Sequence, residues 1–185
     1  MNFNHINNEE LDALDLVKYS NSINSLEYKH YFLDKSGSEH YRLLAYIAQN
    51  NFNINILDIG TLKGCSALAF SVNESNRVYS FNVVNHLDLN QYPNNIEFII
   101  DNILNEKYKN LILDCPYILL DTNHDGIFEE KFYKYLISIQ YRGYLLLDDI
   151  YLNTAMINFW NLIDQEKYDI SPIGHKTGTG VVYFN

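Results

Sequence analysis

Two glycines stand at a fixed distance directly after a short apolar segment, in the stretch Asp58-Ile59-Gly60-Thr61-Leu62-Lys63-Gly64-Cys65-Ser66. Residues 54–59 are apolar and β-branched, and residues 65–72 have a helical pattern, so the glycines lie in a strand-to-helix turn. Glycine lets the backbone turn sharply and approach a ligand closely. The helix that follows presents free backbone N–H groups. The pattern therefore indicates that backbone atoms bind a small molecule here, although a turn that serves the fold alone would use the same residues.

The spacing of the two glycines distinguishes between the classes of ligand that such a loop can bind. A dinucleotide loop requires G-x-G-x-x-G, and Leu62 stands where its middle glycine would be. A P-loop requires G-x-x-x-x-G-K-[ST], and the interval from Gly60 to Gly64 is one residue too short. The pattern that remains is D-x-G-x-x-x-G-x-S.

Carboxylates gather after two later apolar segments. Asp121 and His124 follow one of them, and Asp148 and Asp149 follow the next. If the segments are neighbouring parallel strands, these ends meet at one edge of a sheet. Carboxylates so close repel and raise one another's pKa unless a cation or proton intervenes, and oxygen-rich sites suit Mg²⁺, Mn²⁺ or Ca²⁺. The imidazole of His124 has an ordinary pKa that suits a general base near neutral pH.

Simpler roles remain open for each of these residues. Asp148 and Asp149 could cap the following helix, Asp121 could face a cofactor without any metal, and His124 could order its loop. His175, in the last turn of the chain, is a second candidate base. His5, His30 and His40 are expected at the surface. His86 follows the second strand and could border a bound ligand.

These residues need a sheet to bring them together, and the chain alternates strands with helices. The predicted strands are 54–59, 77–84, 96–100, 117–121, 144–148, 168–173 and 179–184. The predicted helices are 8–20, 38–49, 65–72, 106–110, 127–140 and 153–166. Such alternation implies parallel βαβ units, and strands that are apolar throughout are covered on both faces. The last two strands have only a short connection and must be antiparallel. We expect a three-layer α/β sandwich with one antiparallel edge.

Composition limits the partners. A chain of 185 residues with 47% hydrophobic and 19% charged residues predicts one globular domain. Its net charge of −10 repels phosphate backbones, so we expect no nucleic-acid partner. No apolar run reaches the ~18–20 residues of a membrane span, and residues 1–5 lack the pattern of a secretory signal. Cys65 and Cys115 form no disulfide framework, and we expect a cytoplasmic protein with both thiols reduced.

The pattern D-x-G-x-x-x-G-x-S resembles the first motif of class I S-adenosylmethionine-dependent methyltransferases, and the likeness extends over residues 36–185. It implies a Rossmann-like seven-stranded sheet of order 3-2-1-4-5-7-6 with one antiparallel strand. It also implies one methyltransferase domain over 1–185, with a catalytic core at 36–185 and a helical cap at 1–35. In relatives such a cap covers the acceptor or makes a homodimer, and both roles stay open.

The same resemblance implies where S-adenosylmethionine binds. The backbone around Gly60 and Gly64 would hold its methionine end, and Asn82 occupies the place where the family has an acidic residue for the ribose hydroxyls. An amide at this position cannot form the charge-assisted hydrogen bond that a carboxylate forms with the ribose hydroxyls. The expected cofactor-binding residues are Asp58, Gly60, Thr61, Gly64, Ser66, Asn82, Asp101, Asn102 and Asp121.

The acidic pair after the fifth strand is similar to that of metal-dependent O-methyltransferases of the catechol and macrocin types. This likeness implies that Asp121, Asp148 and Asp149 bind Mg²⁺, and that the ion coordinates the hydroxyls of a small sugar-like acceptor. Asn123 stands where the sugar enzymes have a base, so His124, together with Asp121, is the expected catalytic pair. The alternative is a degenerate cofactor-binding protein without catalysis, which Asn82 and Asn123 favour.

Overall fold

The computed structural model describes residues 3–185, and its centre is a seven-stranded sheet of order β3-β2-β1-β4-β5-β7-β6. Strand β7 runs antiparallel to both β5 and β6, and the other neighbouring pairs are parallel. The strands are β1 (Asn55–Ile59), β2 (Arg77–Asn82), β3 (Ile96–Ile100), β4 (Tyr117–Leu120), β5 (Gly143–Asp148), β6 (Glu166–Asp169) and β7 (Thr179–Phe184). The predicted sheet order and its antiparallel strand are confirmed.

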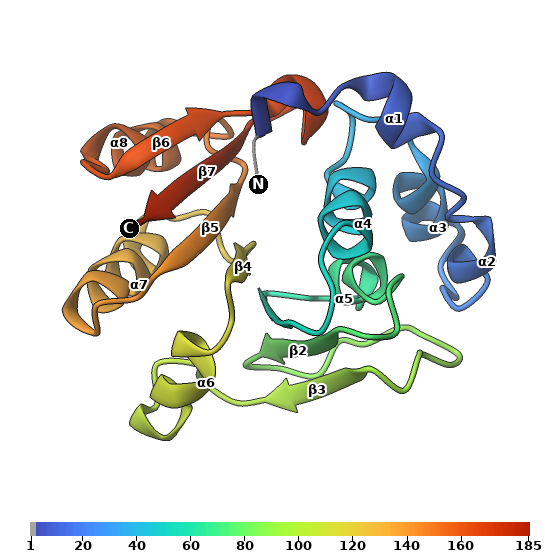
Figure 1. Ribbon diagram of the computed structural model, residues 1–185, viewed down its shortest axis with the longest axis horizontal. Coiled ribbons are helices and arrows are strands. Elements are labelled where there is room, and N and C mark those ends of the chain that lie inside the picture. Colours follow the sequence, from blue (N-terminus) through green and yellow to red (C-terminus); the bar gives the residue numbers. More distant parts are fainter. Residues whose placement is uncertain (1–2) are drawn as a thin grey trace.

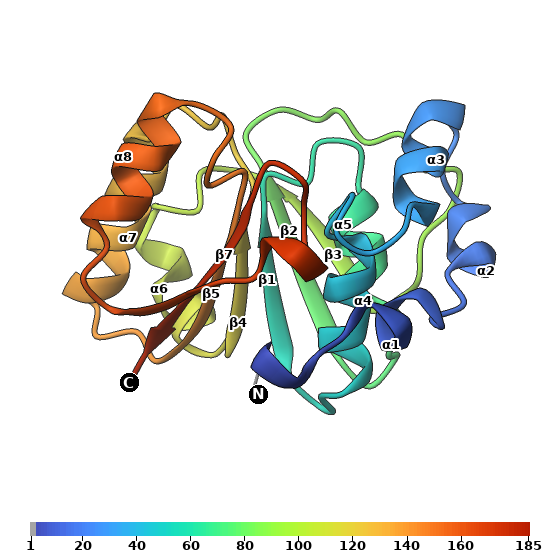
Figure 2. The ribbon, with the colours of Figure 1, turned by 90° about the horizontal axis from the view of Figure 1, so that it is seen from above.

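Helices cover both faces of the sheet (Figures 1 and 2). One face carries α4 (Tyr41–Gln49) and α5 (Cys65–Phe70), with α1 (Asn8–Asp12), α2 (Val17–Ser20) and α3 (Leu26–Leu33) outside them. The other face carries α6 (Lys109–Leu113), α7 (Ile127–Ser138) and α8 (Thr154–Leu162). Short 3₁₀ turns lie at Phe3–His5, Glu106–Tyr108 and Ser171–Ile173.

The core divides into two apolar clusters, one on each face of the sheet. Successive strand residues point to opposite faces, so Ile56 joins the cluster beneath α4 and α5 whereas Leu57 joins the cluster beneath α7. Strands β1, β4 and β5 are buried along most of their length, as their continuous apolar sequence predicts. No helix in residues 3–185 is long and apolar enough to cross a membrane.

Several predicted boundaries are wrong. The single helix expected over 8–20 is two short helices, because Asp15 Oδ1 accepts a hydrogen bond from the Val17 N–H and starts a new turn. The helix expected over 153–166 ends at Leu162, where Lys167 Nζ donates to the carbonyls of Trp160 and Ile163. The sixth strand therefore begins at Glu166 rather than at residue 168.

The helix predicted over 38–49 also begins later than expected. Helix α4 begins at Tyr41, and His40 occupies its N-cap position without a side-chain cap. The Ser38 N–H instead donates to the Lys35 carbonyl in a turn that precedes the helix.

The N-terminal segment is fastened to the core at two places. The guanidinium of Arg42 donates to the carbonyls of Leu11, Leu14, Leu33 and Asp34, at 2.7–3.3 Å. Residues 22–24 also pair with residues 88–90, which belong to the loop after β2. The cap is thus held to α4 and to the loop beyond β2.

Gly60 lets β1 and β4 approach each other closely at the carboxyl edge of the sheet. Its φ is +99°, and an added Cβ would lie 1.5 Å from the carbonyl oxygen of Asp121. No side chain fits there, so only glycine permits the loop after β1 to pass this close to the end of β4.

We expect Arg42→Gln to destabilise the cap more than the sheet. Loss of hydrogen bonds from a charged donor to four partly buried carbonyls should cost about 3 kcal/mol, and amides of residues 8–33 should lose hydrogen-exchange protection first. Arg77→Gln is the control, since its ion pair with Glu97 is exposed and worth less than about 1 kcal/mol. Equal losses for the two variants would contradict this role of Arg42.

Gly60→Ala should lower the free energy of unfolding by about 3 kcal/mol or more, because the new methyl group meets backbone that cannot move aside. Leu62→Gly in the same loop is the matched control. Leu62 adopts φ +43° and is partly exposed, so its change should stay within about 1 kcal/mol. Urea unfolding of both variants measures the difference, and a tolerated Gly60→Ala would show that the two strands can separate.

Candidate active site

A cleft of about 580 Å³ opens at the carboxyl edge of the sheet. That volume lies in the range of small-molecule sites, and its position follows the rule for open α/β sheets. The loops after β1, β2, β3 and β4 form its walls, and Tyr28 of α3, Tyr41 of α4 and Phe128 of α7 add aromatic surface. Seven of the predicted cofactor residues line it: Gly60, Thr61, Ser66, Asn82, Asp101, Asn102 and Asp121.

The other two predicted cofactor residues, Asp58 and Gly64, lie outside the cleft wall. Asp58 is fully buried in β1 and accepts a hydrogen bond of 2.7 Å from the Ser80 hydroxyl. Burial raises the pKa of Asp58 to about 6, although the hydrogen bond from Ser80 opposes the shift. Gly64 has φ +94° at the start of α5, and an added Cβ would meet Leu89 of the loop after β2. Asp58 and Gly64 therefore shape the glycine loop without lining the cleft.

The ends of β2 and β3 present polar groups to the cleft. The side chain of Asn82 accepts from the Val83 N–H at 2.9 Å, which leaves its amide N–H₂ group able to face a ligand. Asp101 forms an ion pair of 2.6 Å with Lys107 and accepts from the Tyr108 hydroxyl at 2.9 Å. These partners, Lys107 foremost, lower the pKa of Asp101 to about 2. Asp101 is therefore an ionised, well-anchored group.

The turn after β4 holds His124 at the wall of the cleft. Its φ is +55°, an uncommon conformation for a residue other than glycine. The buried carboxylate of Glu129 accepts hydrogen bonds from the His124 N–H at 3.0 Å and from the Thr122 hydroxyl at 2.6 Å. Asn153 donates to the His124 carbonyl at 2.8 Å. The backbone of His124 is thus held in place on both sides. Non-glycine residues held at a positive φ often mark functional sites.

The imidazole of His124 faces two carboxylates. Its Nε2 lies 3.3 Å from Asp121 Oδ1 and 3.6 Å from Asp149 Oδ2, yet this buried nitrogen forms no aligned hydrogen bond. Burial lowers the pKa of His124, but the neighbouring Asp121 outweighs that effect and the net shift is upward.

The carboxylates of Asp121, Asp148 and Asp149 form an acidic cluster that also contains two imidazoles, those of His40 and His175. His40 Nδ1 is 3.1 Å from Asp148 Oδ1, and His175 Nδ1 is 3.2 Å from the same oxygen. The prediction that His40 lies at the surface is wrong, since it is only 3% exposed. His5 and His30 are exposed as expected, and His86 lines the cleft.

The predicted ligand set Asp121, Asp148 and Asp149 is divided between different partners. Within residues 3–185, carboxylate and imidazole ligand atoms converge in two groups, His40–Asp148–His175 and Asp121–His124–Asp148. Asp149 belongs to neither group. It accepts from the Thr177 hydroxyl, and its Oδ1 lies 2.9 Å from His175 Nδ1.

The charges in this cluster depend strongly on one another. Burial and the nearby Asp148 raise the pKa of Asp121. Burial opposes ionisation of Asp148, but His40 and His175 outweigh it and hold the pKa of Asp148 well below its usual range. Burial of His40 lowers its pKa, but the Asp148 carboxylate outweighs this effect and raises the pKa of His40 to about 9. Burial likewise lowers the pKa of His175, but hydrogen bonds to Asp148 and Asp149 raise it to about 12. The carboxylates thus attract positive charge to this part of the site.

Sequence reasoning missed two contributors to the site, namely His40 and Glu129. A signal for His40 existed, since a helix that leads into a strand runs antiparallel to it and begins at the carboxyl edge of the sheet. Glu129 had no comparable signal. Cys65 is buried, and burial raises the pKa of its thiol to about 12, which fits a packing role.

No family model and no curated protein sequence matches this chain, but its fold is similar to that of solved methyltransferases. A Podospora anserina methyltransferase bound to S-adenosylhomocysteine is 16% identical, with a TM-score of 0.56 over 78% of each chain. An O-methyltransferase of tomaymycin synthesis from Streptomyces achromogenes, bound to S-adenosylmethionine, is 13% identical, with a TM-score of 0.51 over 78% of this chain and 79% of that one.

Aeropyrum pernix fibrillarin, solved with natively bound S-adenosylmethionine, is 15% identical, with a TM-score of 0.53 over 80% of this chain and 75% of that one. The expectation from the glycine loop is confirmed at the level of the fold: this chain has the fold of the class I S-adenosylmethionine-dependent methyltransferases.

Proposed function

We propose that this protein transfers the methyl group of S-adenosylmethionine to a hydroxyl oxygen of a small polyhydroxylated acceptor such as a sugar or nucleotide-sugar. The observation that carries the proposal is the continuous cleft from the Gly60 loop to His124, where a backbone-lined pocket meets a buried imidazole nitrogen without a hydrogen-bond partner. S-adenosylmethionine supplies an electrophilic methyl group on a sulfonium, so the protein needs only to bind, orient and accept a proton.

The cleft divides into a cofactor end and an acceptor end. In the proposed arrangement, the Gly60 loop holds the methionine part, Asn82 hydrogen-bonds the ribose, and Asp101 with Asn102 faces the adenine. Tyr28, Tyr41 and Phe128 lie on the cleft wall and supply surface against which a sugar ring can pack. Because Tyr28 belongs to α3, the cap contributes to the cleft, which favours a covering role for the N-terminal segment over a dimer role.

His124 serves as the general base in this proposal. Its Nε2 accepts the acceptor's hydroxyl proton, and Asp121 and Asp149, at 3.3 and 3.6 Å, stabilise the imidazolium that results. The oxygen freed of its proton then attacks the methyl carbon in line with the carbon–sulfur bond. Asp121 therefore acts as a positioning and charge-stabilising residue beside the base.

The Mg²⁺ implied by the resemblance does not fit these residues. Mg²⁺ prefers octahedral oxygen ligands, whereas Asp148 is occupied by two imidazoles and Asp149 by Thr177 and His175. The transfer proposed here therefore uses protein groups only. Small acceptors agree with the net charge of −10, which disfavours nucleic acid.

His124→Gln tests the proposal on a panel of sugars and nucleotide-sugars, with formation of S-adenosylhomocysteine as the readout. Loss of the base should lower turnover about 10²–10⁴-fold and leave the Kd for S-adenosylmethionine within about threefold. His30→Gln, at an exposed histidine, is the control. Unchanged turnover in His124→Gln would remove the base role, and cofactor binding without turnover on any acceptor would favour the non-catalytic binding protein.

Asn82→Asp should tighten binding of S-adenosylmethionine. A carboxylate can accept charge-assisted hydrogen bonds from the ribose hydroxyls, which are about twice as strong as neutral ones, so we expect Kd to fall about tenfold. Asn85→Asp adds the same charge to the same loop outside the cleft wall and should leave Kd unchanged. Calorimetry of both variants measures the effect, and equal behaviour would show that Asn82 does not face the ribose.

A further inference from the structure

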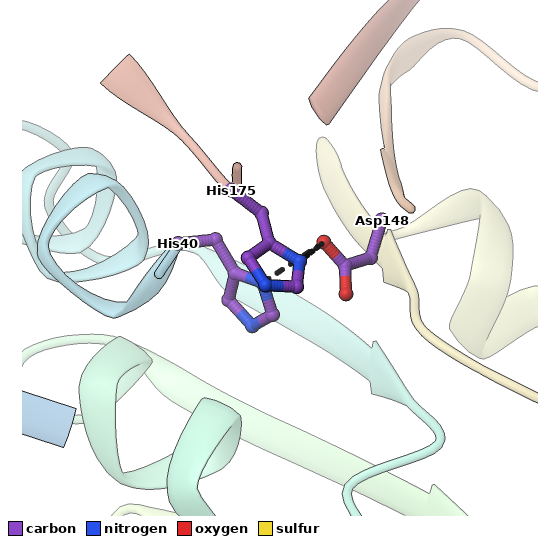
Figure 3. Close-up of side chains that lie close together, drawn as sticks. All are labelled: His40, Asp148 and His175. Atoms are coloured by element: carbon purple, nitrogen blue, oxygen red, sulfur yellow. Dashed lines mark hydrogen bonds and ion pairs between the residues drawn. The ribbon is translucent and has the colours of Figure 1, made fainter. Parts of the chain in front are cut away.

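His40, Asp148 and His175 come from three separate parts of the fold and lie close together (Figure 3). His40 precedes α4, Asp148 ends β5, and His175 lies in the turn before β7. All three side chains are largely buried, and none of them lines the cleft. Their grouping therefore calls for an explanation other than methyl transfer.

Two distances between ligand atoms of these residues match those around a metal ion. The Nδ1 atoms of His40 and His175 lie 3.1 and 3.2 Å from the same oxygen, Asp148 Oδ1. Zinc bonds to nitrogen and oxygen are about 2.0–2.2 Å long, so two ligands at a tetrahedral angle stand about 3.3 Å apart. Asp149 Oδ1, 2.9 Å from His175 Nδ1, supplies a further carboxylate oxygen at the same place.

Hydrogen bonds alone account poorly for this arrangement. His175 Nδ1 has three oxygen neighbours, on Asp148, Asp149 and Thr177, at 2.9–3.2 Å. A single N–H group aligns well with one acceptor only. A cation between the nitrogens and the carboxylates would interact with all of them at once.

The outer ring nitrogens are placed as in bound metal sites. A metal-ligating histidine directs its other N–H toward a carboxylate or carbonyl. His175 Nε2 lies 3.5 Å from Glu39 Oε1, and His40 Nε2 lies 4.0 Å from Asp121 Oδ2. His40 is only 3% exposed, and its buried Nε2 has no hydrogen-bond partner. Each imidazole thus directs one nitrogen to Asp148 and the other toward a second carboxylate.

We propose that His40 Nδ1, His175 Nδ1 and Asp148 Oδ1 bind one divalent transition-metal ion of the zinc type, at a structural site distinct from the cleft. Imidazole ligands favour such ions over Mg²⁺. The ion joins the start of α4, the end of β5 and the turn before β7. This inference is independent of methyl transfer, because metal binding requires neither S-adenosylmethionine nor an acceptor.

Metal titration of the chelator-treated protein tests the site directly. Co²⁺ is the probe, because its visible absorption reports coordination, and Zn²⁺ and Mg²⁺ are competitors. We expect one Co²⁺ per chain, displaced by one equivalent of Zn²⁺, and at least tenfold weaker binding of Mg²⁺. Absence of Co²⁺ and Zn²⁺ binding at 100-fold molar excess would overturn the proposal whether or not the protein transfers methyl groups.

Four histidine variants locate the ion. His40→Gln and His175→Gln should each weaken Co²⁺ binding at least tenfold, whereas the exposed control His30→Gln should not change it. His124→Gln should also retain the ion. Loss of binding in His124→Gln alone would place the ion at Asp121–His124–Asp148 and contradict the site proposed here. Unchanged binding in all four variants would show adventitious metal.

Thermal unfolding of the unmodified chain keeps the test valid if a variant fails to fold. An ion bound only by the folded state, at about 100 times its Kd, should raise Tm by about 5–10 °C. Mg²⁺ at the same concentration should leave Tm unchanged. Equal effects of Co²⁺ and Mg²⁺, or none, would contradict a site with imidazole ligands.

Discussion

The site depends on the contact between Gly60 and the backbone of Asp121. Glycine has no Cβ, and the carbonyl oxygen of Asp121 fills the place where one would be. The Asp121 N–H also donates to the Ile59 carbonyl at 2.9 Å, which continues the β1–β4 pairing past the end of β4. This approach lets the glycine loop and the turn with His124 both line one cleft. The cofactor end and the proposed base are therefore positioned by the same backbone contact.

The second constraint is electrostatic. Parallel strands that end in Asp121 and Asp148 force carboxylates together at one edge, and buried carboxylates need positive partners. The chain provides them as imidazoles from distant segments, with His40 and His175 on Asp148 and His124 beside Asp121 and Asp149. The acidic cluster is thus divided in two. The group of His124, Asp121 and Asp149 suits proton transfer. The group of His40, Asp148 and His175 has the spacing of a metal site.

The sequence predicts the strands and the cleft because both rest on strong local signals, whereas the sheet order was implied by the resemblance to the methyltransferases. Continuous apolar runs identify the buried strands, and the interval from Gly60 to Gly64 identifies the loop. The end of α8 was misjudged because Lys167, from the next strand, satisfies the carbonyls of Trp160 and Ile163. The burial of His40 was also missed, since it depends on where α4 begins relative to β5. Contacts between distant segments leave no mark on local periodicity.

The central claim is that the cleft binds S-adenosylmethionine, and calorimetric titration of the purified protein with this compound tests it most directly. The account predicts one site per chain with micromolar affinity, displaced by S-adenosylhomocysteine, and no binding of NAD, because Leu62 occupies the position of the second glycine of a dinucleotide loop. Binding of NAD, or no binding of S-adenosylmethionine at millimolar concentration, would contradict it.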